Sequence, residues 1–207
     1  MNSKHVLPIK AESFALLVKQ LRLFYEKADM FEIWLDVMKV KGDLAVIQNH
    51  FHKPLIAKSN SLDLLRRAAT AGMQYIDIPH DLEETLEFKN LLNNKKNKVI
   101  RSYHNFDLTP TKEELIEIIK NSKKADLIKI ATKVNSESDN DTLLSLLEIP
   151  EFKDRLIITG MGELARRVRI EAPLNGSVLF FAPLDARYAT AEGQLTISEL
   201  EKEWKIH

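Results

Sequence analysis

The sequence contains no cysteine, and this absence excludes several kinds of site at once. Disulfide bonds, thiolate-held zinc, iron–sulfur clusters and a catalytic thiol all require that residue. The 30 Lys and Arg residues balance the 30 Asp and Glu residues, so the basic excess typical of nucleic-acid binders is missing. We therefore expect no nucleic-acid partner, and because the sequence shows no cluster of metal-ligating residues, we expect no metal site either.

Long hydrophobic runs are missing as well. No apolar stretch approaches the roughly 20 residues that span a bilayer, and the first ten residues lack the hydrophobic core of a secretory signal. The hydrophobic fraction of 44% and the charged fraction of 29% are typical of a globular protein. These features predict a cytoplasmic protein without a membrane partner, formed as one domain over residues 1–207.

The sequence does contain a regular alternation of apolar and amphipathic segments. The apolar segments are mostly unbroken, as expected for parallel strands covered on both faces. The expected strands are residues 5–9, 31–38, 54–59, 75–78, 98–104, 127–132, 156–159 and 178–182. Helices are expected over residues 11–27, 62–71, 81–93 and 139–147, and after a capping box from Thr111 to Glu114.

This alternation favours an α/β fold, a single-domain (β/α)8 barrel. A doubly wound open sheet is the competing fold. The chain has only 6 glycines, and no expected strand leads into a glycine-rich dinucleotide or phosphate-binding loop. This shortage favours the barrel, whose active groups lie at the carboxyl ends of the strands.

Lys129 lies within the apolar segment 125–132, so we expect its side chain to be buried. Burial removes hydration from an ammonium group and favours the neutral amine, the nucleophile that forms a Schiff base with a carbonyl compound. The alternative is a lysine that reaches solvent or pairs with Asp126 or another carboxylate. The pattern leaves both interpretations open.

His104 ends the preceding expected strand. An imidazole, with an ordinary pKa of about 6.5, suits proton transfer near neutral pH, although a lone histidine is more often a loop hydrogen-bonding group. Imine chemistry requires at least an amine nucleophile and a group that transfers protons, and Lys129 and His104 would supply them from neighbouring strands.

Several segments together resemble the type I 3-dehydroquinate dehydratases, in that family's order. They are IRSYHNFDLTP (100–110), ADLIKIATKV (125–134), GMGELARRVRI (160–170) and ATAEGQ (189–194), with weaker matches at FEIWLDVM (31–38) and YIDI (75–78). The resemblance implies a (β/α)8 barrel, a homodimer, no cofactor and a place in the shikimate pathway. It also implies conversion of 3-dehydroquinate to 3-dehydroshikimate through a covalent imine.

The resemblance assigns roles residue by residue. Lys129 matches the Schiff-base lysine, and His104 matches the general acid and base. Arg169 matches the residue that binds the substrate carboxylate, a task that suits a guanidinium group. The substrate-binding matches are completed by Glu32, Thr190 and Gln194, and Met161 is expected to line the pocket.

The sequence also departs from the family pattern in its N-terminal half. Trp34 and Asn60 stand where the family has arginines, and the Glu-Gly-Gly segment whose glutamate orients the histidine is absent. Lys58 and Arg101 are candidate replacements for the arginines. These losses keep two alternatives open: another Schiff-base lyase or aldolase, and a degenerate barrel that acts as a binding protein.

Overall fold

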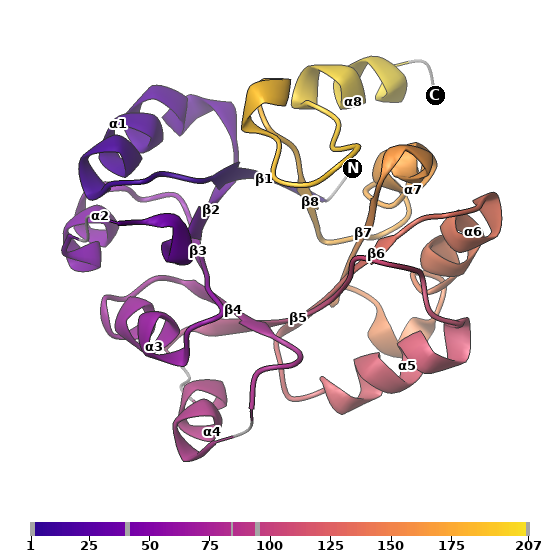
Figure 1. Cartoon of the computed structure of the whole chain (residues 1–207), viewed down its shortest axis with the longest axis horizontal. Helices are drawn as coiled ribbons and strands as arrows, with labels where there is room; N and C mark the ends of the chain where they lie inside the picture. Colours follow the sequence, from indigo (N-terminus) through magenta and orange to yellow (C-terminus); the bar gives the residue numbers. More distant parts are fainter. Residues whose placement is uncertain (1–2, 40–41, 84, 94–95, 206–207) are drawn as a thin grey trace.

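The computed structural model describes residues 3–39, 42–83, 85–93 and 96–205, and within them the chain forms an eight-stranded parallel barrel (Figure 1). The strand order is β7-β6-β5-β4-β3-β2-β1-β8, so neighbours in sequence are neighbours in the sheet. The strands are β1 (Lys4–Ile9), β2 (Met30–Trp34), β3 (Leu55–Lys58), β4 (Tyr75–Pro79), β5 (Lys98–Asn105), β6 (Leu127–Lys133), β7 (Leu156–Met161) and β8 (Leu179–Phe181). The expected (β/α)8 barrel is confirmed, and the open sheet is excluded because β1 pairs with β8.

The ring closes between β7 and β8 through a few hydrogen bonds rather than a regular ladder. The Val178 N–H donates to the Leu156 carbonyl at 2.9 Å. The Ile158 N–H donates to Ser177 Oγ at 3.0 Å, and this hydroxyl donates in turn to the Leu179 carbonyl. Buried Ser177 therefore completes the strand hydrogen bonding where β8 is too short to do so.

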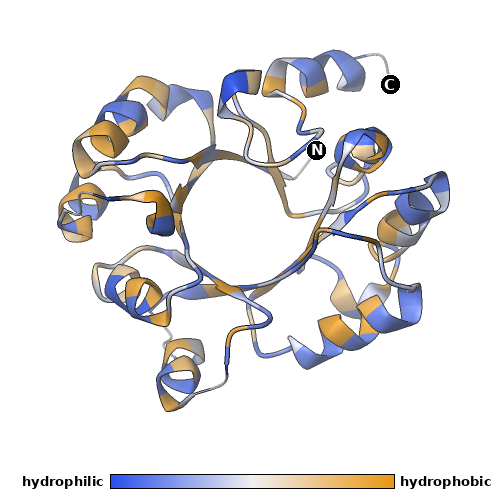
Figure 2. Ribbon diagram, in the orientation of Figure 1, coloured by the Kyte–Doolittle hydropathy of each residue, from blue (hydrophilic) through white to orange (hydrophobic). Residues whose placement is uncertain are grey.

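Helices surround the strands on the outside. They are α1 (Phe14–Phe24), α2 (Leu44–His50), α3 (Leu62–Thr70), α4 (Leu86–Leu92), α5 (Lys112–Asn121), α6 (Glu137–Ser145), α7 (Arg166–Glu171) and α8 (Ile197–Trp204). Figure 2 shows mostly hydrophobic strands, whereas the helices carry residues of both kinds. No helix in the described part of the chain is both long and apolar enough to cross a bilayer.

Several element boundaries differ from those expected. β2 ends at Trp34 rather than at residue 38, because Leu35–Val37 turn into a short 3-10 helix. α6 begins at Glu137, where the Asp139 carboxylate accepts the N–H groups of Asn135 and Ser136. The capping box of Thr111 and Glu114 at the start of α5 is confirmed. The helix expected over residues 81–93 is shorter at its start, and residue 84 lies outside the described part.

Side chains inside the barrel form two layers. The lower layer is apolar and consists of Val6, Met30, Ile56, Ile100, Ile157 and Leu179. Two positions further along the same strands, the next side chains that face the interior of the barrel include Glu32, Lys58 and Ser102. Because side chains alternate along a strand, the apolar layer forms a floor on which the polar groups stand.

Candidate active site

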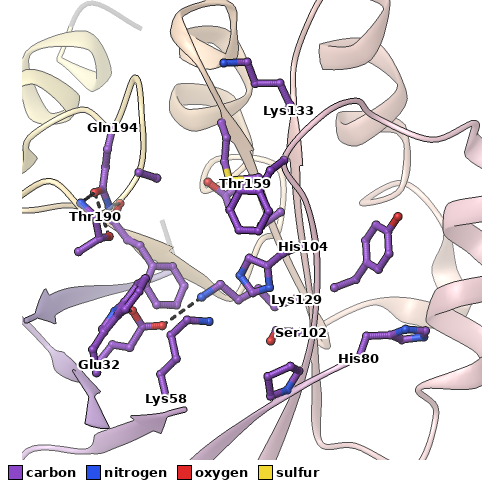
Figure 3. A pocket seen from close by; sticks show the side chains of 18 of the residues that line it. Glu32, Lys58, His80, Ser102, His104, Lys129, Lys133, Thr159, Thr190 and Gln194 are labelled. Carbon is purple, nitrogen blue, oxygen red and sulfur yellow. Dashed lines mark hydrogen bonds and ion pairs between the residues drawn. The ribbon is translucent and has the colours of Figure 1, made fainter. Parts of the chain in front are cut away.

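The polar layer opens into a cavity of about 710 Å³ at the carboxyl ends of the strands. All six residues expected at the site line it: Glu32, His104, Lys129, Arg169, Thr190 and Gln194. Figure 3 shows five of them, Glu32, His104, Lys129, Thr190 and Gln194, converging from β2, β5, β6 and the segment after β8. Met161 lines the cavity as well.

Lys129 is held inside the barrel on β6 and is only 5% exposed. Its Nζ donates to Glu32 Oε1 at 3.1 Å and lies 3.6 Å from Asp77 Oδ2. The same Nζ lies 3.8 Å from the centre of the Phe181 ring. The expected burial is therefore confirmed. The alternative interpretation allowed a carboxylate partner, and Glu32 and Asp77 are such partners, whereas Asp126 instead accepts the Val99 N–H.

Asp77 is a site residue that the sequence interpretation missed. It is fully buried on β4, and its Oδ2 lies 3.6 Å from both Lys58 Nζ and Lys129 Nζ. Burial alone would raise the pKa of this carboxyl, but the two ammonium groups hold the pKa below its usual range. A signal was present in the sequence, because Asp77 interrupts an otherwise apolar strand between Ile76 and Ile78.

His104 lies near the end of β5, with its ring stacked on the Phe106 ring at 6.1 Å. Burial lowers the pKa of His104 to about 3, helped by the nearby Lys58 and Lys129 ammonium groups and opposed by Asp77. The imidazole of His104 is therefore neutral at physiological pH. Asp77 is the carboxylate whose charge favours the protonated form of His104. The family resemblance implied a glutamate beside this histidine, and this chain lacks that glutamate.

Arg169, on the short helix α7, is buried without an acidic partner within the described residues. One of its Nη atoms reaches the Glu192 carbonyl at 3.5 Å, and its Nε has no hydrogen-bond partner. Burial lowers the pKa of this guanidinium to about 10, so it keeps its charge at neutral pH. A buried cation that lines a cavity and has no acidic partner nearby is chemically suited to bind an anion.

Thr190 and Gln194 belong to the segment between β8 and α8, which closes one side of the cavity. Gln194 Oε1 accepts the Thr190 N–H at 2.7 Å, and Gln194 Nε2 donates to the Phe181 carbonyl at 3.0 Å. Between them, Glu192 pairs with Lys133 of β6. Gly193 has a φ of 67°, and a Cβ there would lie 2.2 Å from the Gly162 carbonyl oxygen. Only glycine allows the segment to lie this close to the end of β7.

Trp34 takes part in the site although it replaces an arginine of the family pattern. Its indole N–H donates to Glu32 Oε2 at 2.7 Å, so it orients the carboxylate that also accepts from Lys129. The ammonium groups of Lys10 and Lys58 lie 4.1 and 5.4 Å from its ring centre. Cationic groups thus surround Trp34 even though its own side chain is uncharged.

The two candidate replacements for the missing arginines have different positions. Lys58 lines the cavity. Arg101 faces away from it, donating to the Pro79 and His80 carbonyls at 2.8 and 2.9 Å and lying over the Phe88 ring of α4. The suggestion that Arg101 replaces a substrate arginine is therefore wrong.

The comparisons with known proteins agree with this geometry. The family model for type I 3-dehydroquinase matches residues 5–206. The 3-dehydroquinate dehydratase of Methanocaldococcus jannaschii is 29% identical over 97% of both chains. That of one Methanococcus maripaludis strain is 34% identical over 72% of this chain and 69% of its own.

A solved structure shows the same fold. The type I 3-dehydroquinate dehydratase of Clostridium difficile, solved with covalently modified comenic acid, has a TM-score of 0.83 at 23% identity and covers 99% of this chain and 91% of its own. The family model matches nearly the whole sequence, and the chain belongs to the type I 3-dehydroquinase family.

Proposed function

We propose that this protein converts 3-dehydroquinate to 3-dehydroshikimate by forming a Schiff base on Lys129. The observation that carries the proposal is a buried primary amine inside a cavity that also holds a neutral imidazole and a guanidinium whose Nε has no hydrogen-bond partner. These groups match the three requirements of the reaction: a nucleophile for the carbonyl, a base for the adjacent C–H, and a cation for the carboxylate.

The reaction begins when Lys129 Nζ adds to the substrate carbonyl carbon and the carbonyl oxygen leaves as water. The resulting iminium withdraws electrons and makes the proton on the adjacent carbon acidic. His104 takes this proton, and the freed electron pair forms a carbon–carbon double bond. The hydroxyl group on the next carbon accepts the proton from His104 and leaves as water. A water molecule then hydrolyses the imine, so the net change is the loss of one water.

The charged groups around Lys129 assist the first step. The carboxylates of Glu32 and Asp77 lie 3.1 and 3.6 Å from Nζ, so their negative charge stabilises the cationic iminium that forms there. The substrate carboxylate at Arg169 brings a negative charge into the site, and a negative charge favours the protonated form of the His104 imidazole. Substrate binding thus makes the imidazole a better base.

The remaining matched residues bind the substrate. Thr190 and Gln194 offer a hydroxyl and an amide beside the cavity, and Glu32 offers a carboxylate beside the reacting amine. Together with Arg169 they surround a ligand from opposite sides of Lys129. Such positioning accounts for a large share of the rate in reactions of this kind.

Borohydride trapping tests the proposal. The protein is mixed with 3-dehydroquinate, reduced with borohydride, and its peptides are analysed by mass spectrometry. We expect an adduct on the peptide that contains Lys129, together with dehydration measured from the ultraviolet absorbance of the conjugated product. Lys129→Met should remove both, since the thioether has a similar length but no nucleophilic nitrogen.

Other outcomes would favour the alternatives. An adduct with other carbonyl compounds, but no dehydration of 3-dehydroquinate, would support another Schiff-base lyase or aldolase. A folded protein that forms no adduct and shows no turnover would support a degenerate binding barrel. Dehydration that survives Lys129→Met would contradict the imine mechanism.

Four further expectations stay predictions: a homodimer, a cytoplasmic location, a role in the shikimate pathway and a single domain over residues 1–207. Light scattering after size-exclusion chromatography measures the oligomeric state directly. Loss of growth without aromatic amino acids on deletion of the protein, restored by the wild type but not by Lys129→Met, would support the pathway.

A further inference from the structure

Lys58 belongs to a closed ring of side chains at the floor of the cavity. Its Nζ lies 3.6 Å from Asp77 Oδ2, and the same oxygen lies 3.6 Å from Lys129 Nζ. Lys129 pairs with Glu32 at 3.1 Å, and Glu32 accepts the Trp34 N–H at 2.7 Å. The centre of the Trp34 indole lies 5.4 Å from Lys58 Nζ, and this contact closes the ring of side chains. Figure 3 shows Lys58, Glu32 and Lys129 pointing toward one another.

The charge balance of this ring indicates what it can bind. Two ammonium groups face two carboxylates, so the ring is neutral as a whole. Arg169, in contrast, has no acidic partner among the described residues. An anionic group of a ligand therefore binds at Arg169, and the ring accepts a polar group without charge.

Lys58 is placed to donate to such a group. Its side chain is 13% exposed and lines the cavity, and its distance to Asp77 is longer than that of an ordinary charge-assisted hydrogen bond. Glu32 Oε1, across the ring, is an acceptor. A hydroxyl group suits this pair, since its oxygen accepts from an ammonium while its proton is donated to a carboxylate.

The position of Lys129 indicates which hydroxyl group of the substrate reaches Lys58 and Glu32. When the carbonyl carbon is bonded to Lys129 Nζ, the two ring carbons next to it lie beside the groups that surround Nζ. One of these groups is Glu32 Oε1, which is 3.1 Å from Nζ. In 3-dehydroquinate, one of the two carbons next to the carbonyl carries a hydroxyl group. Resting on the proposed function, we propose that Lys58, together with Glu32, binds the hydroxyl group adjacent to the reacting carbonyl.

This role explains how the site can function without the arginines of the family pattern. Trp34 keeps the Glu32 carboxylate oriented through its indole N–H, and Lys58 supplies the cationic donor from the neighbouring strand. Lys58 is thus a specificity residue: it distinguishes a hydroxylated ketone from one that lacks the hydroxyl.

The test compares two ligands and three variants. The first ligand is 3-dehydroquinate, for which kcat and KM are measured by absorbance. The second is 3-oxocyclohexane-1-carboxylate, which keeps the ketone and the carboxylate but has no hydroxyl. Its half-saturating concentration is measured from borohydride-trapped adduct on Lys129. The variants are Lys58→Met, Lys58→Arg and, as a control, Lys98→Met, an exposed lysine that also lies over an aromatic ring but at the opposite end of β5.

We expect Lys58→Met to lower kcat/KM for 3-dehydroquinate roughly 10- to 100-fold, the effect of losing a hydrogen bond to a charged group. The half-saturating concentration of the second ligand should change less than threefold. Lys58→Arg should restore part of the loss, and Lys98→Met should behave like the wild type. Circular dichroism confirms that each variant is folded.

Two results would overturn the proposal. An equal loss for both ligands would show that Lys58 acts through Lys129 or His104 rather than on the hydroxyl. An unchanged kcat/KM in Lys58→Met would show no contact at all. If the wild type itself forms no adduct and dehydrates nothing, the proposed function fails instead, and the two failures are thereby distinguished.

Discussion

The carboxylate of Asp77, fully buried on β4, lies 3.6 Å from the ammonium of Lys129 on β6. This pairing places a permanent negative charge beside the amine that the proposed reaction uses. It also makes the stability of the barrel depend on a group inside the cavity, because the same carboxylate neutralises Lys58. The charged groups of the proposed active site are therefore also part of the buried core.

Asp77→Asn should destabilise the fold substantially. The variant leaves the Lys58 and Lys129 ammonium groups with one carboxylate between them, and breaking a buried ion pair typically lowers the free energy of unfolding by about 3 kcal/mol or more. Urea denaturation followed by circular dichroism measures the change. The control is Asp141→Asn, which removes an exposed pair with Arg167 and should lower the stability by about 1 kcal/mol or less. Equal effects of the two variants would contradict the structural role of Asp77.

The low pKa of His104 predicts a specific loss of stability in acid. The folded pKa of about 3 lies below the ordinary value of 6.5, so the unfolded chain binds the proton more readily. The contribution of the neutral imidazole is therefore complete above pH 6.5 and is lost as the pH falls toward 3. His104→Gln removes this proton uptake.

Between these pH values, the stability of the wild type should fall more steeply than that of His104→Gln. One group contributes at most about 1.4 kcal/mol per pH unit. Urea unfolding curves at several pH values provide the two slopes. Parallel pH dependences in the two proteins would show that His104 titrates normally.

His104→Ala should separate imine formation from dehydration. The variant keeps the Lys129 amine and the Arg169 guanidinium, so 3-dehydroquinate should still form a borohydride-trapped adduct. Removing a general base typically lowers the rate by a factor of about 10² to 10⁴. Adduct yield and kcat are measured on the same sample. A kcat equal to that of the wild type would remove His104 from the proposed mechanism.

The barrel could be predicted from the sequence because its signals are local. Unbroken apolar segments mark buried parallel strands, and the capping box at Thr111 marks the start of α5. The helices α2, α7 and α8 were not predicted, because they contain only 7, 6 and 8 residues and provide little periodicity. α8 carried a usable signal in the capping box of Thr196 and Glu199.

The site was predicted less completely, for a geometric reason. When both faces of a strand are buried, the apolar pattern does not tell which alternate residues face the inside of the barrel. Lys58 and Arg101 were therefore indistinguishable in sequence, although one lines the cavity and the other contacts α4. The partners of Lys129 and Arg169 come from residues far away in the chain, and no local pattern identifies such contacts.

The ion pair between Glu192 and Lys133 should control how readily the segment after β8 covers the cavity. The pair joins that segment to β6, and the Gly162 N–H adds a bond to the Glu192 carbonyl at 3.0 Å. Because the carboxylate is largely exposed, we expect Glu192→Gln or Lys133→Met to raise KM up to about fivefold with little change in kcat. The double variant should show no further increase, since both changes remove one interaction.

Salt dependence provides a second measurement of this pair. Raising the ionic strength screens exposed charges, so the KM of the wild type should rise toward that of the variants, whose own KM should change less. Asp185→Asn is the matched control, because it breaks an exposed pair with Arg187 in the same segment. If Asp185→Asn raised KM as much as Glu192→Gln, the increase in KM would come from the net charge of the segment and not from the ion pair between Glu192 and Lys133. A KM that changes only in the Glu192 and Lys133 variants would show that this one ion pair holds the segment over the substrate.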